Sequence, residues 1–207
     1  MALGLVVLAA ACGPAPSAVP DPEVPGLPSG PTAAAGAEVY DAEVPIAWFR
    51  LAFDLTRDEF LFPPTAARAY AYASVALWEA VAPGVAGGRS LAGQLNGLND
   101  VPAPREELHW PTVANTALAG IMRRFYTSQA SLSAIRELEQ ELNDRFRAET
   151  SGAHFGRSVA HGQRVEMAIW QWSRSDGYRE FADCVYTAPE GSGLWSPTPP
   201  AFEAPVE

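Results

Sequence analysis

Two histidines and two arginines recur at helical spacing in the C-terminal third of the chain. They are His154, Arg157, His161 and Arg164, at intervals of 3, 4 and 3 residues, so a helix would place them along one face. Imidazole and guanidinium groups gathered on one face could bind an anion. The alternative is a polar face in contact with water, opposite the packed stripe of the helix. Charged side chains are mostly exposed in proteins, so we favour this second interpretation.

The sequence contains none of the short fingerprints that indicate a metal, nucleotide or dinucleotide site. HExxH, CxxC, P-loop and GxGxxG patterns are all missing. Two Ser-Gly pairs, Ser151-Gly152 and Ser192-Gly193, are more typical of helix caps and turns than of nucleophile sites.

Paired polar residues within one helical segment are equally unconvincing as a catalytic site. Glu137 with Glu141, and Glu139 with Asn143, are expected on the solvent side of a helix, not as a carboxylate dyad. His109 stands alone before Trp110 and is expected in a loop.

The composition describes an acidic globular chain. It has 207 residues, is 48% hydrophobic and carries a formal net charge of −10. Such a surface repels phosphate backbones, so we expect no nucleic-acid partner. All 14 basic residues are arginine, which fits a GC-rich genome and has no bearing on mechanism.

The first twelve residues have the features of an export signal. Residues 2–11 form an uncharged apolar run, too short to span a bilayer but suited to a signal peptide. The run ends in small residues before Cys12, as in a bacterial lipobox, where the cysteine is acylated. Ala9 occupies the position where leucine is usual, and no basic residue precedes the run. A lipoprotein of the bacterial periplasm or cell envelope, anchored to the membrane through Cys12, is the favoured interpretation; an ordinary cleaved signal and a buried segment are the alternatives.

Residues 13–44 are rich in proline and alanine and have no apolar period, which predicts a disordered, semi-rigid tether. Apolar residues then recur at helical spacing, and no alternating strand pattern of useful length occurs. The sequence therefore predicts an all-α domain over residues 45–182, a bundle of about five helices. The helices are expected at residues 45–57, 63–82, 111–128, 132–149 and 153–174.

A series of motifs in this region resembles bacterial vanadium-haloperoxidase-like proteins of the type 2 phosphatidic acid phosphatase superfamily. In chain order the motifs are Trp48, the segment Pro63–Tyr72 with Ala67-Arg68, Trp78-Glu79-Ala80, Gly156 with Val159-Ala160, Trp170, Asp176-Gly177, and Gly193-Leu194-Trp195-Ser196-Pro197-Thr198-Pro199-Pro200. Each motif is short, and their order together with the last string carries the resemblance. It implies half of a larger α-helical fold.

The same resemblance implies an oxyanion site for vanadate or phosphate, built from a lysine, two arginines, a Ser-Gly-His segment and a further histidine. The chain has no lysine, no Ser-Gly-His and no Arg-Pro pair. We therefore assign no catalytic, cofactor-binding or metal-binding residue, and expect the oxyanion to bind a C-terminal half that is absent here.

Residues 183–207 are rich in proline and are expected to be the linker to that half. Two interpretations follow. In the first, the chain is the front part of a haloperoxidase-like or acid-phosphatase-like enzyme and is inactive as given; its partner would be the complementary half or a second copy. In the second, it is a non-catalytic helical binding or scaffold lipoprotein.

Overall fold

The computed structural model describes residues 36–181, 187, 189 and 191–200. Cys12, the expected signal segment and most of the expected tether lie outside the described residues, and so does Cys184. The export and lipid-anchor assignments therefore stay predictions.

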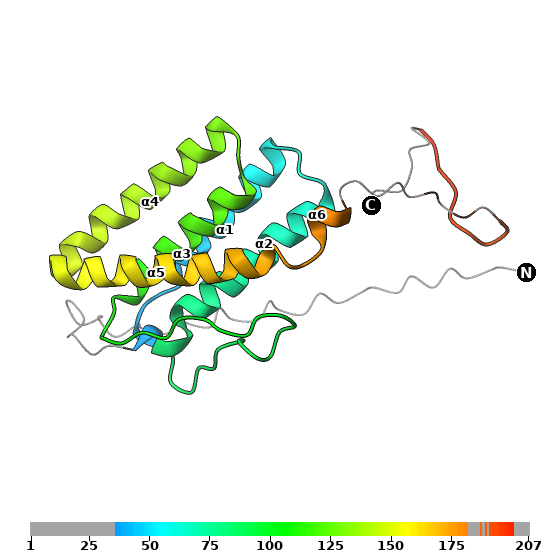
Figure 1. The fold of residues 1–207 in the computed structure, drawn as a ribbon. Helices are drawn as coiled ribbons and strands as arrows, with labels where there is room; N and C mark the ends of the chain where they lie inside the picture. Colours follow the sequence, from blue (N-terminus) through cyan, green and yellow to red (C-terminus); the bar gives the residue numbers. More distant parts are fainter. Residues whose placement is uncertain (1–35, 182–186, 188, 190, 201–207) are drawn as a thin grey trace, which may run out of the picture. The chain divides into compact units, whose positions relative to one another are not determined.

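The described residues form an all-α structure without strands, as the sequence predicts. The helices are α1 (Glu43–Asp58), α2 (Pro63–Val81), α3 (Trp110–Phe125), α4 (Gln129–Glu149), α5 (Gly152–Ser173) and the short α6 (Tyr178–Phe181), with 3-10 turns η1 (Ala37–Val39) and η2 (Ala82–Gly84) (Figure 1). None of these helices is both long and apolar enough to cross a bilayer.

The main difference from the expected boundaries lies between the third and fourth helices. α3 ends at Phe125 and α4 already begins at Gln129, three residues before the expected start. The reason is a side-chain cap: Ser128 Oγ accepts a hydrogen bond from Ser131 N at 3.1 Å. This bond satisfies one of the backbone donors left open at a helix N-terminus.

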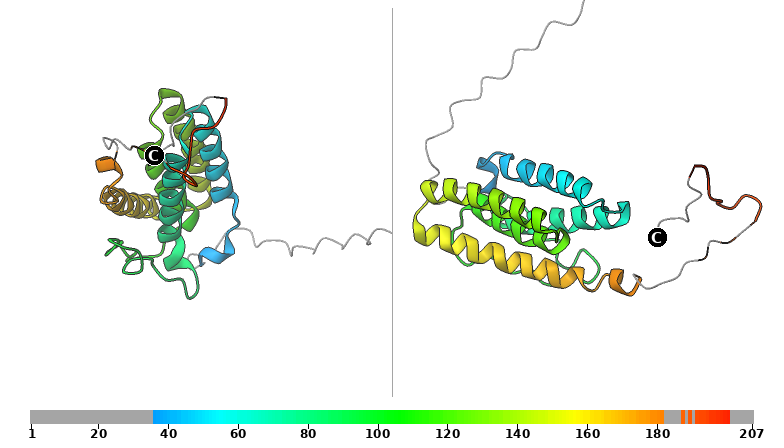
Figure 2. Two further views of the ribbon diagram at one scale, coloured as in Figure 1. Left: turned by 90° about the vertical axis from the view of Figure 1, so that its right-hand side faces the viewer. Right: turned by 90° about the horizontal axis from the view of Figure 1, so that it is seen from above.

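Helix α3 is the centre of the fold and contacts α1, α2, α4 and α5 (Figure 2). Eleven of its sixteen residues are buried, from Trp110 to Met122. Helix α3 packs tightly against α5 at Gly162, where an added Cβ would lie 2.7 Å from Val113 O and 2.8 Å from Thr116 Cβ. Gly162 thus allows the neighbouring backbone to come close, as its place in the apolar stripe predicts.

Residues that carry the family resemblance connect distant parts of the chain. Arg68 on α2 donates through Nε to Asp176 Oδ2 at 2.5 Å and through Nη2 to Ser173 O at 2.7 Å. Tyr72 OH also donates to Asp176 Oδ2, at 3.0 Å. The arginine therefore ties the C-terminal end of α5 to α2. Asp176 Oδ1 in turn accepts from Tyr178 N at 3.0 Å, at the start of α6.

Trp48 and Glu79 have similar structural roles. Trp48, fully buried, donates through Nε1 to Asn115 Oδ1 at 2.8 Å, which joins α1 to α3. Glu79, 2% exposed, accepts from Ser90 Oγ at 2.8 Å and Leu91 N at 2.5 Å. The buried carboxylate thereby holds the start of the long connection between α2 and α3 against the bundle.

Candidate functional site

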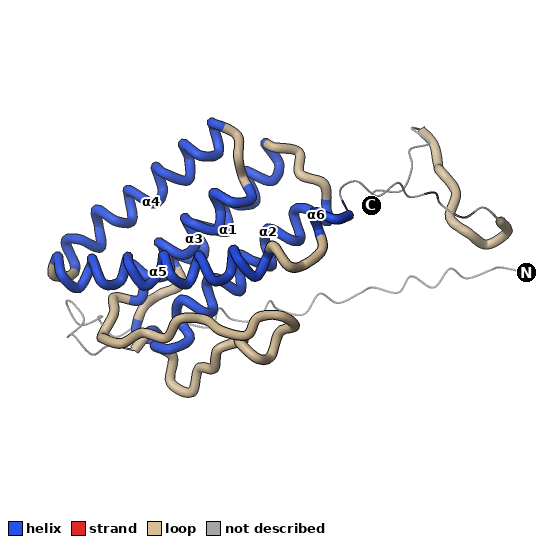
Figure 3. The backbone as a smooth tube through the Cα atoms, viewed as in Figure 1, coloured by secondary structure: helices blue, strands red, loops and turns tan. Residues whose placement is uncertain are grey.

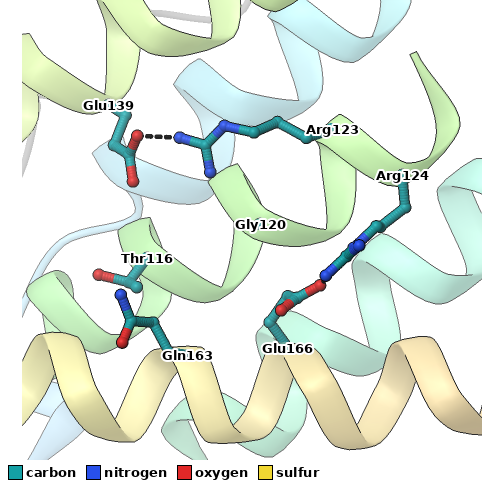
Figure 4. Close-up of a pocket in the computed structure, with 7 residues that line it drawn as sticks. All are labelled: Thr116, Gly120, Arg123, Arg124, Glu139, Gln163 and Glu166. Carbon is teal, nitrogen blue, oxygen red and sulfur yellow. Dashed lines mark hydrogen bonds and ion pairs between the residues drawn. The ribbon is translucent and has the colours of Figure 1, made fainter. Parts of the chain in front are cut away.

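A polar groove lies over α3, between α4 and α5. The two flanking helices are joined by Thr150 and Ser151, and they diverge from this shared end (Figure 3). The groove has a volume of about 370 Å³. The residues that line it are Thr116, Gly120, Arg123, Arg124, Glu139, Gln163 and Glu166 (Figure 4).

On the α4 side, the groove contains an ion pair between Arg123 of α3 and Glu139 of α4. The backbone carbonyl of Glu139 also accepts from Asn115 Nδ2 at 3.3 Å, and Asn143 Oδ1 accepts from the same amide at 3.1 Å. The expected solvent-side position is therefore wrong for Glu139 and Asn143, because α3 packs against the side of α4 that carries them. Glu137 and Glu141 are exposed, as predicted.

On the α5 side, Glu166 is 6% exposed and accepts a hydrogen bond from Arg124 Nε at 2.9 Å. The Arg124 guanidinium lies 5.2 Å from the centre of the Trp170 ring, within the range of a cation–π contact. Gly120 on α3 makes room for this arrangement, since a Cβ there would lie 2.5 Å from Glu166 Cγ.

The groove is thus polar and balanced in charge, with two guanidinium groups and two carboxylates. Its lining includes no His or Cys, and no cluster of three or more potential metal ligands occurs in the described part of the chain. The arrangement is suited to holding a polar ligand through ion pairs and hydrogen bonds. Sequence reasoning missed it, because the lining comes from three helices and no local pattern unites it.

On α5, the row of His154, Arg157, His161 and Arg164 does not form an anion site. His161 is fully buried, and burial, followed by the nearby Arg164, lowers the pKa of its imidazole to about 4. His154 Nδ1 lies 3.0 Å from Thr150 Oγ1, and Arg157 pairs with Glu106 at 2.9 Å. The solvated-face interpretation is also wrong for His161. Because α5 packs against both α2 and α3, residues outside its apolar stripe are buried as well.

His109 lies in the connection before α3, as the sequence predicts, but it is only 1% exposed. The rings of Tyr40 and Phe146 each lie 5.3 Å from its ring, and its Nδ1 lies 2.7 Å from Thr112 Oγ1. Burial, with smaller contributions from His154 and Arg145, lowers its pKa to about 4. Glu149 Oε2 lies 3.5 Å from Nε2, but this contact does not outweigh burial, so the imidazole is neutral at pH 7.

Comparison with known proteins identifies the fold. No protein-family model and no curated protein matches the chain. Among solved structures, the chain is similar to one described as the first bacterial vanadium-dependent iodoperoxidase, with 29% sequence identity and a TM-score of 0.66. The match covers 78% of this chain and 38% of that one. The described helices therefore have a vanadium-haloperoxidase-like fold, and the chain spans well under half the length of the structure it matches.

Proposed function

We propose that residues 45–182 are the N-terminal helical half of a vanadium-haloperoxidase-like or acid-phosphatase-like protein. The structural match to a vanadium-dependent iodoperoxidase carries this proposal, since it has 29% identity over 78% of the chain. The ordered motifs, from Trp48 to the Gly193–Pro200 string, support the assignment to the N-terminal half.

The role proposed for this half is to frame the pocket of the larger protein. Trp48, Arg68, Glu79 and Asp176 make contacts between helices and loops of the bundle, which fits a framing role. Such contacts hold neighbouring elements at fixed positions, which a catalytic pocket requires.

The groove and the two buried histidines do not fit vanadate or phosphate. An oxyanion of this kind is held by several uncompensated cationic or N–H donors. The groove guanidiniums of Arg123 and Arg124 are each paired with a glutamate, and the buried His109 and His161 are neutral at pH 7. We therefore propose that oxyanion chemistry depends on the residues of a C-terminal half.

The discriminating experiment is to sequence the source DNA beyond the codon for Glu207 in all three frames. The proposal expects a lysine, an Arg-Pro pair, a Ser-Gly-His segment and a later histidine within a few hundred codons. A stop codon followed by unrelated sequence would support the alternative, a non-catalytic helical binding or scaffold lipoprotein.

A biochemical test complements the sequencing. The purified 207-residue chain is titrated with vanadate and followed by ⁵¹V NMR, then assayed for iodide oxidation with hydrogen peroxide. We expect no bound vanadate signal and no triiodide. Saturable vanadate binding by this chain would contradict the proposal that the oxyanion needs other residues.

We further propose export through the apolar run of residues 2–11 and membrane anchoring through Cys12. If this cysteine is acylated, radiolabelled palmitate should be incorporated into the protein in a bacterial host, and the Cys12→Ser variant should carry no label and leave the membrane fraction. Equal labelling of both proteins would reject lipidation at this position.

A further inference from the structure

We propose that the groove between α3, α4 and α5 binds a small zwitterion, such as a free α-amino acid, with its ammonium group directed inward and its carboxylate at the mouth. This ligand class is independent of any haloperoxidase chemistry.

Charge balance selects the ligand class. The floor helix α3 supplies Arg123 and Arg124, and the opposite walls supply Glu139 from α4 and Glu166 from α5 (Figure 4). A simple anion would be attracted by the two guanidiniums but repelled by the two carboxylates. A simple cation would be attracted by the carboxylates but repelled by the guanidiniums. A molecule with one charge of each sign can satisfy both kinds of group.

Depth sets the orientation of the ligand. The glutamate side chains are the more buried members of the two ion pairs, with 22% of Glu139 and 8% of Glu166 exposed. The arginine side chains are 33% and 38% exposed. An ammonium group therefore finds the more buried partners, and a carboxylate finds the more exposed ones.

The existing ion pairs leave hydrogen-bonding capacity for such a ligand. Arg123 uses Nη2 to contact Glu139, and Arg124 uses Nε to contact Glu166. A guanidinium carries five N–H donors and a carboxylate accepts at about four lone pairs, so one contact occupies only part of each group. A ligand can thus bind without breaking either pair.

Size limits the ligand to a small molecule. The groove volume of about 370 Å³ is near the lower end of the range for ligand pockets, roughly 300 to 1,000 Å³. Gly120 contributes to this space: a Cβ at its position would collide with Glu166 Cγ at 2.5 Å and displace the side chain that we assign to the ammonium group.

The test is a titration of the ¹⁵N-labelled chain with L-alanine, followed by ¹H–¹⁵N NMR at pH 7. Acetate and methylammonium, which each carry one of the two charges, are titrated in parallel. We expect saturable shifts at the Gly120 amide and the Gln163 side-chain amide with alanine, at a concentration at least tenfold lower than with either half-ligand. Shifts that saturate equally well with acetate or with methylammonium, or no saturable shift with alanine, would overturn the proposal.

Variants locate the site. Glu166→Gln and Arg123→Gln should each weaken alanine binding at least tenfold, whereas Arg147→Gln should leave it unchanged. Arg147 also forms an ion pair, with Asp144 at 2.9 Å, but it does not line the groove. If Glu166→Gln fails to fold, the exposed Gln163→Ala serves in its place and should weaken binding several-fold. Unaltered binding in the folded groove variants would reject the site.

Discussion

At the residue scale, the two buried histidines make the stability of this protein depend on pH. His109 and His161 are 1% and 0% exposed, and burial lowers the pKa of each from 6.5 to about 4. In the unfolded chain both return to the ordinary pKa. As the pH falls below 6.5, the unfolded state therefore binds protons that the folded state excludes, and stability is lost until the pH reaches the folded pKa.

We predict that the free energy of unfolding falls between pH 7.5 and pH 5, by about 2 kcal/mol for each of the two histidines. Urea unfolding at several pH values measures it. As the pH falls, the stability contributed by the neutral histidines is lost before the stability contributed by carboxylates such as Asp176. Burial alone would raise the pKa of Asp176, but hydrogen bonds from Arg68, Tyr178 N and Tyr72 outweigh it and lower the pKa, so this group loses its contribution at lower pH.

His161→Gln is the matched variant for this prediction. Replacing one of the two titrating groups should reduce the pH-dependent loss by about half, whatever its effect on stability at pH 7.5. An unchanged slope in the variant would show that His161 is not the group responsible.

At the element scale, the contact between α3 and α5 depends on a glycine. Gly162 and Gly156 both lie in α5, but only Gly162 faces a neighbouring backbone. At Gly156 an added Cβ would have no heavy atom within 4 Å. The same substitution should therefore have opposite effects at the two positions.

We predict that Gly162→Ala destabilises the protein by about 1–3 kcal/mol, because the methyl group would force α3 and α5 apart. Gly156→Ala should stabilise it by up to about 1 kcal/mol, because alanine is the better helix former. Urea denaturation of both variants tests the pair. Equal effects at the two positions would contradict the close approach at Gly162.

At the scale of the whole molecule, an apolar surface is left uncovered along α1 and the turn that follows it. Ile46 and Phe53, seven residues apart on α1, are 47% and 64% exposed. Phe60 and Phe62 in the turn are 86% and 65% exposed, and Phe60 has a left-handed backbone with φ of 51°. Exposed apolar patches on soluble proteins mark interaction sites or surfaces prone to aggregation. The apolar surface on α1 and the following turn is compatible with the proposal that a C-terminal half packs against this chain.

We predict that the isolated chain self-associates and binds the dye ANS, and that a variant with Phe53, Phe60 and Phe62 changed to serine loses both properties. Its free energy of unfolding should change by no more than about 0.5 kcal/mol per site, because the three rings are largely exposed in the folded state. Size-exclusion chromatography with light scattering measures the association. A monomeric parent chain that binds no ANS would contradict the prediction.

The sequence by itself determined the class of fold and the place of the five long helices, because apolar periodicity and proline at helix starts act within a few residues. It also predicted the close approach at Gly162. The family resemblance in its motifs predicted the haloperoxidase-like fold, which the structural match confirms. The sequence did not predict α6, whose four residues are too few for a period.

Tertiary structure alone decided which polar residues meet and which are buried. Arg68 and Asp176 are 108 residues apart in sequence, and the groove combines residues of three helices. His161 and Glu139 were expected on solvated faces because an amphipathic pattern assigns one buried stripe to each helix. A helix that packs against more than one neighbour buries more than one stripe, and only the arrangement of the whole bundle determines where its other neighbours lie.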